Sequence, residues 1–453
     1  MTKEHADVVV VGAGLVGSIL AIFLRQRGYN VRMFEKRADM RVGQAEGGRS
    51  INLVVTSRGL QALEQVGLKK EVLAITKPVY GRMMHDLDGE LTYQSYSKDD
   101  SECNYSVSRA QLNKEMMTHA ERAGVEIEFS CECTDIDHET GTIWFGERKV
   151  TADAIFATDG AGSAVRRELV KQGHLEDSVD FLPHGYKELL IPAGENNAFL
   201  IEEKALHIWP RGEHMLMALP NLDGSFTVTL YLANEGEVSF AALQTKEDVM
   251  AYFQKYYADS LALLPTLGEE FFENPTGLLG TVRCAPWYVG EKVVLLGDAA
   301  HGVVPFFGQG MNAGFEDCSV LDKCLDVCSD QLDEAIAMYS DIQKANGDAI
   351  ADMAIENFIE MSEKVGDEAF LLQKQVEAKV GRTFPDLYLS RYSMVTHSLI
   401  PYHVCQKAGL IQQEILDALT QDIQSADEVD LSKAELLIRE KLSPFYAQYQ
   451  VEW

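Results

Sequence analysis

The 453-residue sequence is poor in long apolar runs, in cysteine and in basic side chains. No window reaches the roughly 18 consecutive apolar residues that a membrane-spanning helix needs, so no membrane anchor is expected. The apolar run at residues 8–11 is too short for a signal-peptide core, and no small-residue cleavage site follows it. These absences predict a soluble, cytoplasmic protein.

The eight cysteines are sparse and irregularly spaced. Cys131 and Cys133 alternate in a strand-like stretch, and Cys324 and Cys328 lie one helical turn apart. No His or Asp completes a metal-binding set near either pair, so buried or idle thiols and no metal site are expected.

Basic residues are outnumbered, because 40 Lys and Arg stand against 70 Asp and Glu and give a net charge of −30. A chain this acidic binds nucleic acid or an anionic membrane poorly. An anionic ligand must therefore be held by local arginines or by backbone N–H groups.

The N-terminal segment carries a dinucleotide-binding pattern. Residues 7–11 form a continuous β-branched run, typical of a strand buried on both faces. The GAGLVG motif at 12–17 follows, then helical spacing over 18–27 and a second strand that ends at Glu35. A lone GxGxxG motif is weak evidence, but here the strand, the helix and the terminal acid are all in place. The glycines allow a pyrophosphate to approach the helix N-terminus, and Glu35 would accept hydrogen bonds from a ribose diol.

A second such motif is absent, since residues 160–165 lack the third glycine. One dinucleotide is therefore expected, and this motif alone leaves NAD and FAD open. Two later segments are informative: a strand at 154–157 runs into Asp159-Gly160, and a strand at 293–296 runs into GDAAH and a glycine-rich loop before a helix from about Gln309. In this order, the three motifs resemble those of the single-component FAD-dependent aromatic hydroxylases related to para-hydroxybenzoate hydroxylase. The resemblance implies bound FAD.

The resemblance also implies a role for several of these residues. Asp298 would accept from a ribityl or ribose hydroxyl, Arg109 would reach the pyrophosphate, and the N–H groups of Met311 and Asn312 would meet the flavin N1–C2=O edge. The simpler interpretations are a surface salt bridge for Arg109 and helix capping for Asn312. The full set of implied FAD contacts is Gly12, Gly14, Val16, Gly17, Glu35, Lys36, Arg37, Val54, Arg109, Cys133, Asp159, Ala164, Asp298, Pro305, Gly310, Met311 and Asn312.

Further segments are similar to the kynurenine 3-monooxygenases within this family, from the N-terminus to about residue 405. They are GRSINL (48–53), YGRMMHDLDG (80–89), SVSRAQLNK, HIWPRG (207–212), MALPNLDGSFTVTLYL, PFFGQGMNAGFEDC and YSMVT (392–396). This likeness implies L-kynurenine as the small-molecule substrate.

The likeness extends to the substrate contacts. Arg82 would grip the substrate carboxylate, with Tyr96, Asn357 and Tyr392 as further polar contacts. The residues that would wall the aromatic ring are Leu206, Met215, Leu219, Tyr231 and Phe306. The simpler interpretations are a surface arginine for Arg82, helix-surface polar residues for Asn357 and Tyr392, and plain core for the Leu and Met.

The implied reaction is NADPH- and O₂-dependent. NADPH reduces the flavin, O₂ adds to give a C4a-hydroperoxide, and its distal oxygen passes to ring position 3, which yields 3-hydroxykynurenine in tryptophan degradation. The neutral aniline of kynurenine already activates the ring, so no side chain is assigned as an acid or base, and a structural role is expected for His301. Two alternatives stay open: an FAD hydroxylase of another aromatic carboxylate, and a flavin oxidoreductase without oxygen insertion.

The predicted fold is α/β, with a Rossmann-type FAD-binding domain, an interleaved antiparallel-sheet substrate domain and a helical C-terminal domain. The first is assigned residues 1–75, 100–183 and 272–329, the second 76–99 and 184–271, and the third 330–453. Within the second, strands are expected in LLIPAG, AFLIEE, HIWPRG, HMLMALP and SFTVTLYL. A homodimer is left open.

Overall fold

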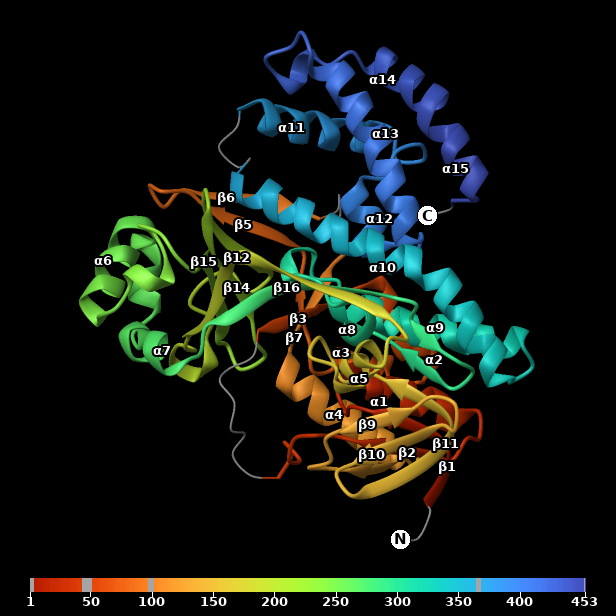
Figure 1. Ribbon diagram of the computed structural model, residues 1–453. Coiled ribbons are helices and arrows are strands. Elements are labelled where there is room, and N and C mark those ends of the chain that lie inside the picture. Colours follow the sequence, from red (N-terminus) through yellow and green to blue (C-terminus); the bar gives the residue numbers. More distant parts are fainter. Residues whose placement is uncertain (1–3, 43–50, 97–101, 364–367, 452) are drawn as a thin grey trace.

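The computed structural model of the protein describes residues 4–42, 51–96, 102–363, 368–451 and 453. Figure 1 shows three parts: a parallel-sheet unit that contains the N-terminus, a second sheet beside it, and a group of helices from the C-terminal part above both. The predicted α/β class is confirmed.

The parallel-sheet unit is built around the N-terminal strand. The order of its main path is β17-β18-β11-β1-β2-β8, and β9 and β10 extend it beside β11. Its strands are β1 (Glu4–Val11), β2 (Val31–Phe34), β8 (Glu126–Glu128), β9 (Asp135–Asp137), β10 (Thr142–Phe145), β11 (Arg148–Ala157), β17 (Tyr288–Val289) and β18 (Val293–Leu295). The β1 valines are buried, as the continuous apolar run predicted. Helix α1 (Leu15–Gln26) packs on this strand, and Phe145 of β10 stacks on Phe34 of the neighbouring β2.

The helices of this unit include the predicted one after the glycine-rich turn. They are α1 (Leu15–Gln26), α2 (Ser57–Gln65), α3 (Lys69–Leu73), α4 (Arg109–Arg122), α5 (Ala164–Lys171), α8 (Asp298–His301) and α9 (Gly310–Val327). Helix α1 ends where Gly28 takes a φ of +94°, and α1 packs against α4 and α9.

The second sheet has seven strands in the order β16-β12-β15-β14-β13-β5-β6. Their bounds are β5 (Gly81–His85), β6 (Leu91–Ser95), β12 (Glu176–Ile191), β13 (Ala205–Arg211), β14 (His214–Pro220), β15 (Phe226–Ala233) and β16 (Gly277–Ala285). Neighbours are antiparallel except β13 and β5, whose parallel register sets Leu206 beside Arg82. Helices α6 (Lys246–Tyr256) and α7 (Leu267–Glu273) close one face over a core that includes Trp209 and Phe226.

One predicted strand is wrong. The AFLIEE segment at 198–203 forms no strand, because β5 occupies the place beside β13 where it would have paired. Its apolar side chains Phe199 and Ile201 pack instead against the core under this sheet.

A small third sheet, in the order β3-β7-β4, lies between the two larger sheets. Its strands are β3 (Asn52–Val55), β4 (Lys77–Val79) and β7 (Asn104–Ser108). Strand β16 lies in the range 272–329 assigned to FAD binding, yet it pairs with β12 in the seven-stranded sheet. The domain limits drawn from the sequence therefore remain a proposal.

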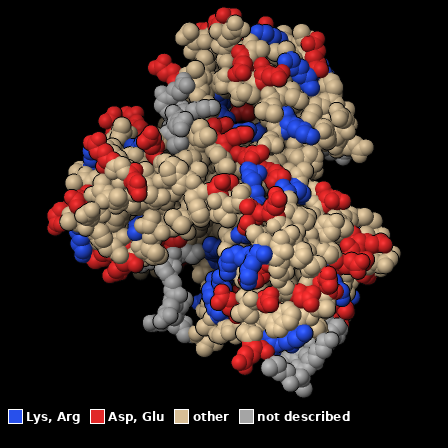
Figure 2. All heavy atoms as spheres, in the orientation of Figure 1, with Lys and Arg blue, Asp and Glu red and all other residues tan. Residues whose placement is uncertain are grey.

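The C-terminal part is helical, as predicted. Its helices are α10 (Leu332–Glu363), α11 (Glu368–Thr383), α12 (Arg391–His397), α13 (Tyr402–Thr420), α14 (Leu431–Leu437) and α15 (Ser443–Tyr449). Long α10 crosses the middle of the molecule below the others (Figure 1). Among the described residues, no helix combines the length and apolar character needed to cross a membrane. Acidic side chains are spread over the face in Figure 2, with smaller groups of Lys and Arg near its centre.

Candidate active site

A single cavity of about 1050 Å³ joins the two sheets. It begins at the turn between β1 and α1, passes the N-terminus of α9, and ends between β5, β13 and α12. Its volume exceeds the range of about 300–1,000 Å³ usual for one small ligand. The cavity therefore has room for a dinucleotide and a small substrate in one continuous space.

The glycines of the turn between β1 and α1 serve two different purposes. Gly12 has a φ of +102°, and a Cβ on Gly17 would lie 2.0 Å from the Gly12 carbonyl oxygen, so these two are required by the chain's own packing. A Cβ on Gly14 would meet nothing within 4 Å. Since Gly14 lines the cavity, the open space over it is available to a ligand.

The N-terminus of α1 offers donors to that space. Its N-cap is Gly14, which makes no side-chain cap, so the N–H groups of the first turn have no partner within the helix. Beside it, the Glu35 carboxylate accepts from the Ala13 N–H at 2.9 Å and from the Arg37 side chain at 2.7 Å. Burial raises the pKa of Glu35, but these hydrogen bonds outweigh it and lower the pKa overall. Glu35 is thus an ionised acceptor for a sugar hydroxyl.

Two more charged groups at this end are incompletely paired. One oxygen of Asp159 accepts from the N–H groups of Ala164 and Val165, at 2.7 and 3.3 Å, whereas the other is buried and unpartnered among the described residues. Arg109 is exposed at the cavity and has no ion pair within that part of the chain. An unused acceptor, an unpaired cation and free helix N–H groups together fit FAD, with its hydroxyls and pyrophosphate.

The N-terminus of α9 has no side-chain cap, but the Asn312 side chain holds it in place. The Asn312 amide accepts from the Thr56 N–H at 2.9 Å and donates to the carbonyls of Val54 and Gly308, at 2.8 and 3.0 Å. Asn312 thereby ties the glycine-rich loop to β3. The backbone N–H groups of the first turn of α9 have no partner within the helix, so the contact that the resemblance implies for Met311 and Asn312 stays a prediction.

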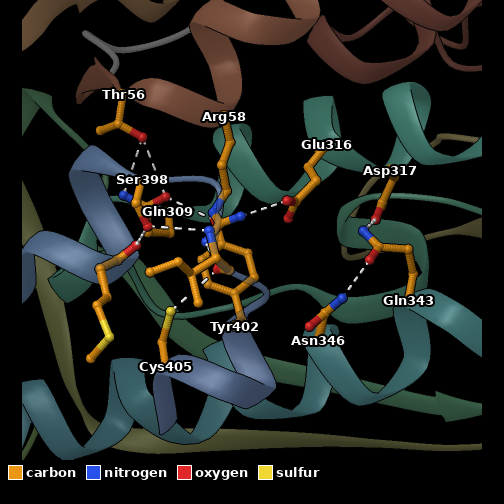
Figure 3. A network of polar contacts seen from close by, with 12 residues as sticks. Thr56, Arg58, Gln309, Glu316, Asp317, Gln343, Asn346, Ser398, Tyr402 and Cys405 are labelled. Atoms are coloured by element: carbon orange, nitrogen blue, oxygen red, sulfur yellow. Dashed lines mark hydrogen bonds and ion pairs between the residues drawn. The ribbon is translucent and has the colours of Figure 1, made fainter. Parts of the chain in front are cut away.

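A buried network fastens this loop to the C-terminal helices (Figure 3). Arg58 of α2 is fully buried, pairs with Glu316 of α9 at 2.5 Å, and also donates to the Ile400 carbonyl. Its guanidinium lies 3.9 Å from the ring centroid of Tyr402, whose hydroxyl donates to Gln309 at 2.9 Å. Since Ile400 directly follows α12, the network holds α12 in place over the cavity.

His301, the last residue of α8, is buried beside α9. It hydrogen-bonds Asp317 at 2.6 Å and stacks on Trp287 with ring centroids 4.8 Å apart. Asp317 also accepts from the Gly297 N–H at 2.8 Å. His301 does not line the cavity, which agrees with the structural role expected for it.

The far end of the cavity is organised around Arg82. Its guanidinium lies 4.8 Å from the ring centroid of Tyr392 and 5.9 Å from that of Tyr96, and the two rings stack 5.6 Å apart. Burial lowers the pKa of Arg82, but the phenols of Tyr392 and Tyr96 more than offset this, so its pKa is raised and it stays charged. No described carboxylate forms an ion pair with it, and its Nε is buried without a partner.

Apolar side chains line the space between the two ends. Tyr231 and Phe306 face each other with ring centroids 5.0 Å apart, and Leu206, Met217 and Leu219 add aliphatic surface from β13 and β14. Such a dry, narrow region suits an aromatic ring.

Most of the predicted site residues line this one cavity. Those at the substrate end are Arg82, Tyr96, Leu206, Leu219, Tyr231, Phe306 and Tyr392. Those at the cofactor end are Gly12, Gly14, Val16, Glu35, Lys36, Arg37, Val54, Arg109, Cys133, Asp159, Ala164, Asp298, Pro305, Gly310 and Met311.

Four predicted residues do not line it. Gly17 is packed under the turn, Asn312 is used as described, and Met215 is buried opposite Tyr231 on β15. Asn357 donates to the Phe306 carbonyl at 2.7 Å and so supports the wall rather than facing the cavity. In GRSINL, residues 48–50 lie outside the described residues.

Several polar lining residues were missed from the sequence. They are Asn52, Thr56, Asn104, Ser106, Thr227, Thr229 and Thr396. Asn52 is the last residue but one of GRSINL, and Thr396 is the last residue of YSMVT, so both lay within segments already singled out. Thr227 and Thr229 lay within MALPNLDGSFTVTLYL, whereas Asn104 had no local signal, because only pairing within the small sheet brings its strand to the cavity.

Comparison with known proteins agrees with this geometry. The family model described as "FAD binding domain" matches residues 5–353. The kynurenine 3-monooxygenase of Myxococcus xanthus is 47% identical, over 99% of this chain and 98% of its own length. That of Dictyostelium discoideum is 43% identical, over 97% and 99%.

Solved structures share the fold at lower identity. A 2-methyl-3-hydroxypyridine-5-carboxylic acid oxygenase superposes with a TM-score of 0.66 at 19% identity, over 82% of this chain and 96% of the other. PqsL of Pseudomonas aeruginosa, in complex with 2-aminobenzoylacetate, superposes with a TM-score of 0.64 at 20% identity, over 79% and 97%.

The open space over Gly14 can be tested by filling it. Gly14 has a φ of −75°, which alanine adopts freely, so Gly14→Ala should leave the unfolding midpoint of the FAD-free protein unchanged. Its FAD affinity should fall about tenfold or more, because the methyl group takes the place of a close backbone–phosphate approach. Titration of the FAD-free protein with FAD measures this.

Gly17→Ala is the matched control, since its Cβ would meet backbone and should lower the unfolding midpoint itself. Wild-type FAD affinity in Gly14→Ala would show that no phosphate lies over this turn.

The buried network predicts a large stability effect at Arg58. Arg58→Met leaves the Glu316 carboxylate without its donor and the Ile400 carbonyl with only the weak Cys405 thiol donor, which should cost about 3–5 kcal/mol of unfolding free energy in urea titrations. Lys246→Met, which breaks the exposed pair with Glu269, should change the unfolding free energy far less, because solvent screens that pair. Equal losses in the two variants would contradict the assigned importance of the buried pair.

Proposed function

This chain belongs to the kynurenine 3-monooxygenases, a family of FAD-dependent hydroxylases, and on that basis we propose that it hydroxylates L-kynurenine at ring position 3 with NADPH and O₂. One observation carries the proposal: a single cavity links a dinucleotide-binding turn to Arg82, a half-buried arginine whose Nε is buried and which no described carboxylate neutralises. The carboxylate of an aromatic amino acid would pair with that arginine. Its ring would lie in the apolar part of the cavity, between the arginine and the dinucleotide-binding turn.

FAD is held by the first half of this cavity. Gly14 and the N-terminus of α1 would hold its pyrophosphate, Glu35 would accept from a ribose diol, and the N–H groups at the start of α9 would face the flavin. When bound, FAD supplies the redox chemistry, which takes electrons from NADPH and activates O₂ for transfer to the ring.

The protein's own task is to place the substrate and keep water out. Arg82 pairs with the carboxylate, and its planar guanidinium can form two parallel hydrogen bonds that fix the orientation of the amino-acid group. Tyr231 and Phe306 confine the ring beside the N-terminus of α9. Pro305 and Phe307, in the glycine-rich loop before α9, also line this part of the cavity. Exclusion of water from this region protects a reactive oxygen species from side reactions.

The site needs no general base for this substrate. The aniline nitrogen of kynurenine is neutral and already donates electron density to the neighbouring ring carbon. His397, the histidine nearest Arg82 and its tyrosines, is not part of the cavity lining, and burial lowers its pKa to about 4.

Product analysis tests the proposed reaction. Purified holoenzyme with NADPH, O₂ and L-kynurenine should form 3-hydroxykynurenine in a ratio near one per NADPH consumed, as chromatography and cofactor oxidation together measure. Stoichiometric hydrogen peroxide without a hydroxylated product would instead establish a flavin oxidase. Hydroxylation of another aromatic acid but not of kynurenine would keep the reaction class and overturn the substrate.

Arg82→Met tests the substrate orientation. Loss of one partner of a buried charge pair should weaken kynurenine binding by about 2–5 kcal/mol, or roughly 30-fold or more. FAD content per polypeptide should not change, because Arg82 lies at the opposite end of the cavity from Gly14. Wild-type kynurenine affinity in this variant, measured by titration of the holoenzyme, would refute the assignment.

A further inference from the structure

Unsatisfied polar atoms gather at the substrate end of the cavity. Four buried side-chain atoms there have no hydrogen-bond partner within the described chain: Arg82 Nε, Asn104 Oδ1, Thr396 Oγ1 and His397 Nε2. A buried polar atom without a partner is costly and uncommon. Three of these residues, Arg82, Asn104 and Thr396, line the cavity, which indicates that a polar ligand completes the site.

Tyr392 is the point they share. The Asn104 amide donates to its hydroxyl at 3.1 Å, and the Arg82 guanidinium lies 4.8 Å from its ring centroid. Thr396 lies one turn further along α12, on the same helix face, and lines the cavity as Tyr392 and Asn104 do. The His397 ring is 6.0 Å from the Tyr392 ring, behind the lining.

A carboxylate alone does not satisfy this group. Arg82 only donates hydrogen bonds, so a carboxylate suits it. Asn104 already uses its amide nitrogen on Tyr392, which leaves a carbonyl oxygen that only accepts. The Thr396 hydroxyl can also accept. Of the two, Asn104 Oδ1 requires a donor on the ligand, which a carboxylate lacks, whereas the Thr396 hydroxyl can either donate or accept.

We propose that Asn104 Oδ1 and Thr396 Oγ1 form a subsite for the α-ammonium group of an amino-acid substrate, and thus select amino acids over the corresponding carboxylic acids. The proposal rests on the proposed function, because it takes Arg82 to hold the neighbouring carboxylate. An ammonium group carries three donors, enough for both oxygens and one more acceptor.

The charge balance of the cavity supports neutral acceptors here. All carboxylates that line its described part follow strands β2, β8, β11 and β18 at the cofactor end: Glu35, Asp39, Glu132, Asp159 and Asp298. None lies beside Arg82, so the substrate's own carboxylate neutralises the arginine. The ammonium group then needs only dipolar partners, and a further protein carboxylate would compete with the substrate for Arg82.

The test compares two ligands in matched variants of the FAD-loaded enzyme. The ligands are L-kynurenine and 4-(2-aminophenyl)-4-oxobutanoate, which is identical except that it lacks the α-amino group. Wild type should bind kynurenine about 10- to 100-fold more tightly, as expected for hydrogen bonds to a charged group. Changes in the flavin absorbance on titration measure both affinities.

Thr396→Val and Asn104→Leu remove the acceptors with little change in volume. Each should weaken kynurenine binding about tenfold or more while binding of the deaminated ligand stays within about twofold, so the preference shrinks. Thr396→Ser keeps the hydroxyl and should retain the wild-type preference. Unfolding midpoints and FAD content of all variants show whether the fold is intact.

Three results would overturn the subsite: equal wild-type affinity for the two ligands, equal losses for both ligands in the variants, or a Thr396→Ser variant that behaves like Thr396→Val. The proposed function fails differently. In that case wild type binds neither ligand, or Arg82→Met binds both as tightly as wild type does.

Discussion

The Arg82 guanidinium lies half-buried in the cavity of this acidic protein, and no carboxylate of the described residues pairs with it. Arg82 is surrounded by two phenols and an amide, and none of the described carboxylates reaches it. An unpaired charge that is partly removed from water is costly, and an anionic ligand in the cavity would offset that cost. Much of the cavity follows from that requirement: stacked tyrosines stabilise the guanidinium, acidic residues are kept to the far end, and the apolar walls between direct the ring of a bound acid toward α9.

The parts that meet at Arg82 come from three distant stretches of the chain. Strand β5 brings the arginine, β7 brings Asn104, and α12 brings Tyr392 and Thr396. Their meeting depends on contacts that lie elsewhere, above all the Arg58 cluster, which joins α2 and α9 to the carbonyl of Ile400 just beyond α12. The glycine-rich loop before α9 is held by the same cluster, because the Tyr402 hydroxyl donates to Gln309. Placement of the substrate and shape of the cofactor site are therefore mechanically connected through one buried arginine.

Local patterns in the sequence were reliable where one short segment determines its own structure. The β-branched run, the GAGLVG turn and the helix after it appear as β1 and α1, since burial on both faces and helical periodicity are readable within about thirty residues. The segment at 198–203 has equally apolar residues but forms no strand, because strand formation depends on a free neighbour and β5 had taken that position. Arg82, Tyr96 and Tyr392 were grouped through family resemblance, as no spacing rule links them. The Arg58 cluster and Asn104 were not foreseen, because ion pairs and sheet pairings over hundreds of residues leave no periodic trace.

The late position of α12 in the chain has a consequence for biosynthesis. A growing polypeptide completes the glycine-rich turn, the first helices and the α9 loop well before the segment from Tyr392 to Ile400 leaves the ribosome. The nascent chain can thus present the glycine-rich turn to its coenzyme while the far end of the cavity still lacks α12. Arg58 stays without its last acceptor until that segment docks, so closure of the pocket is among the final events of maturation.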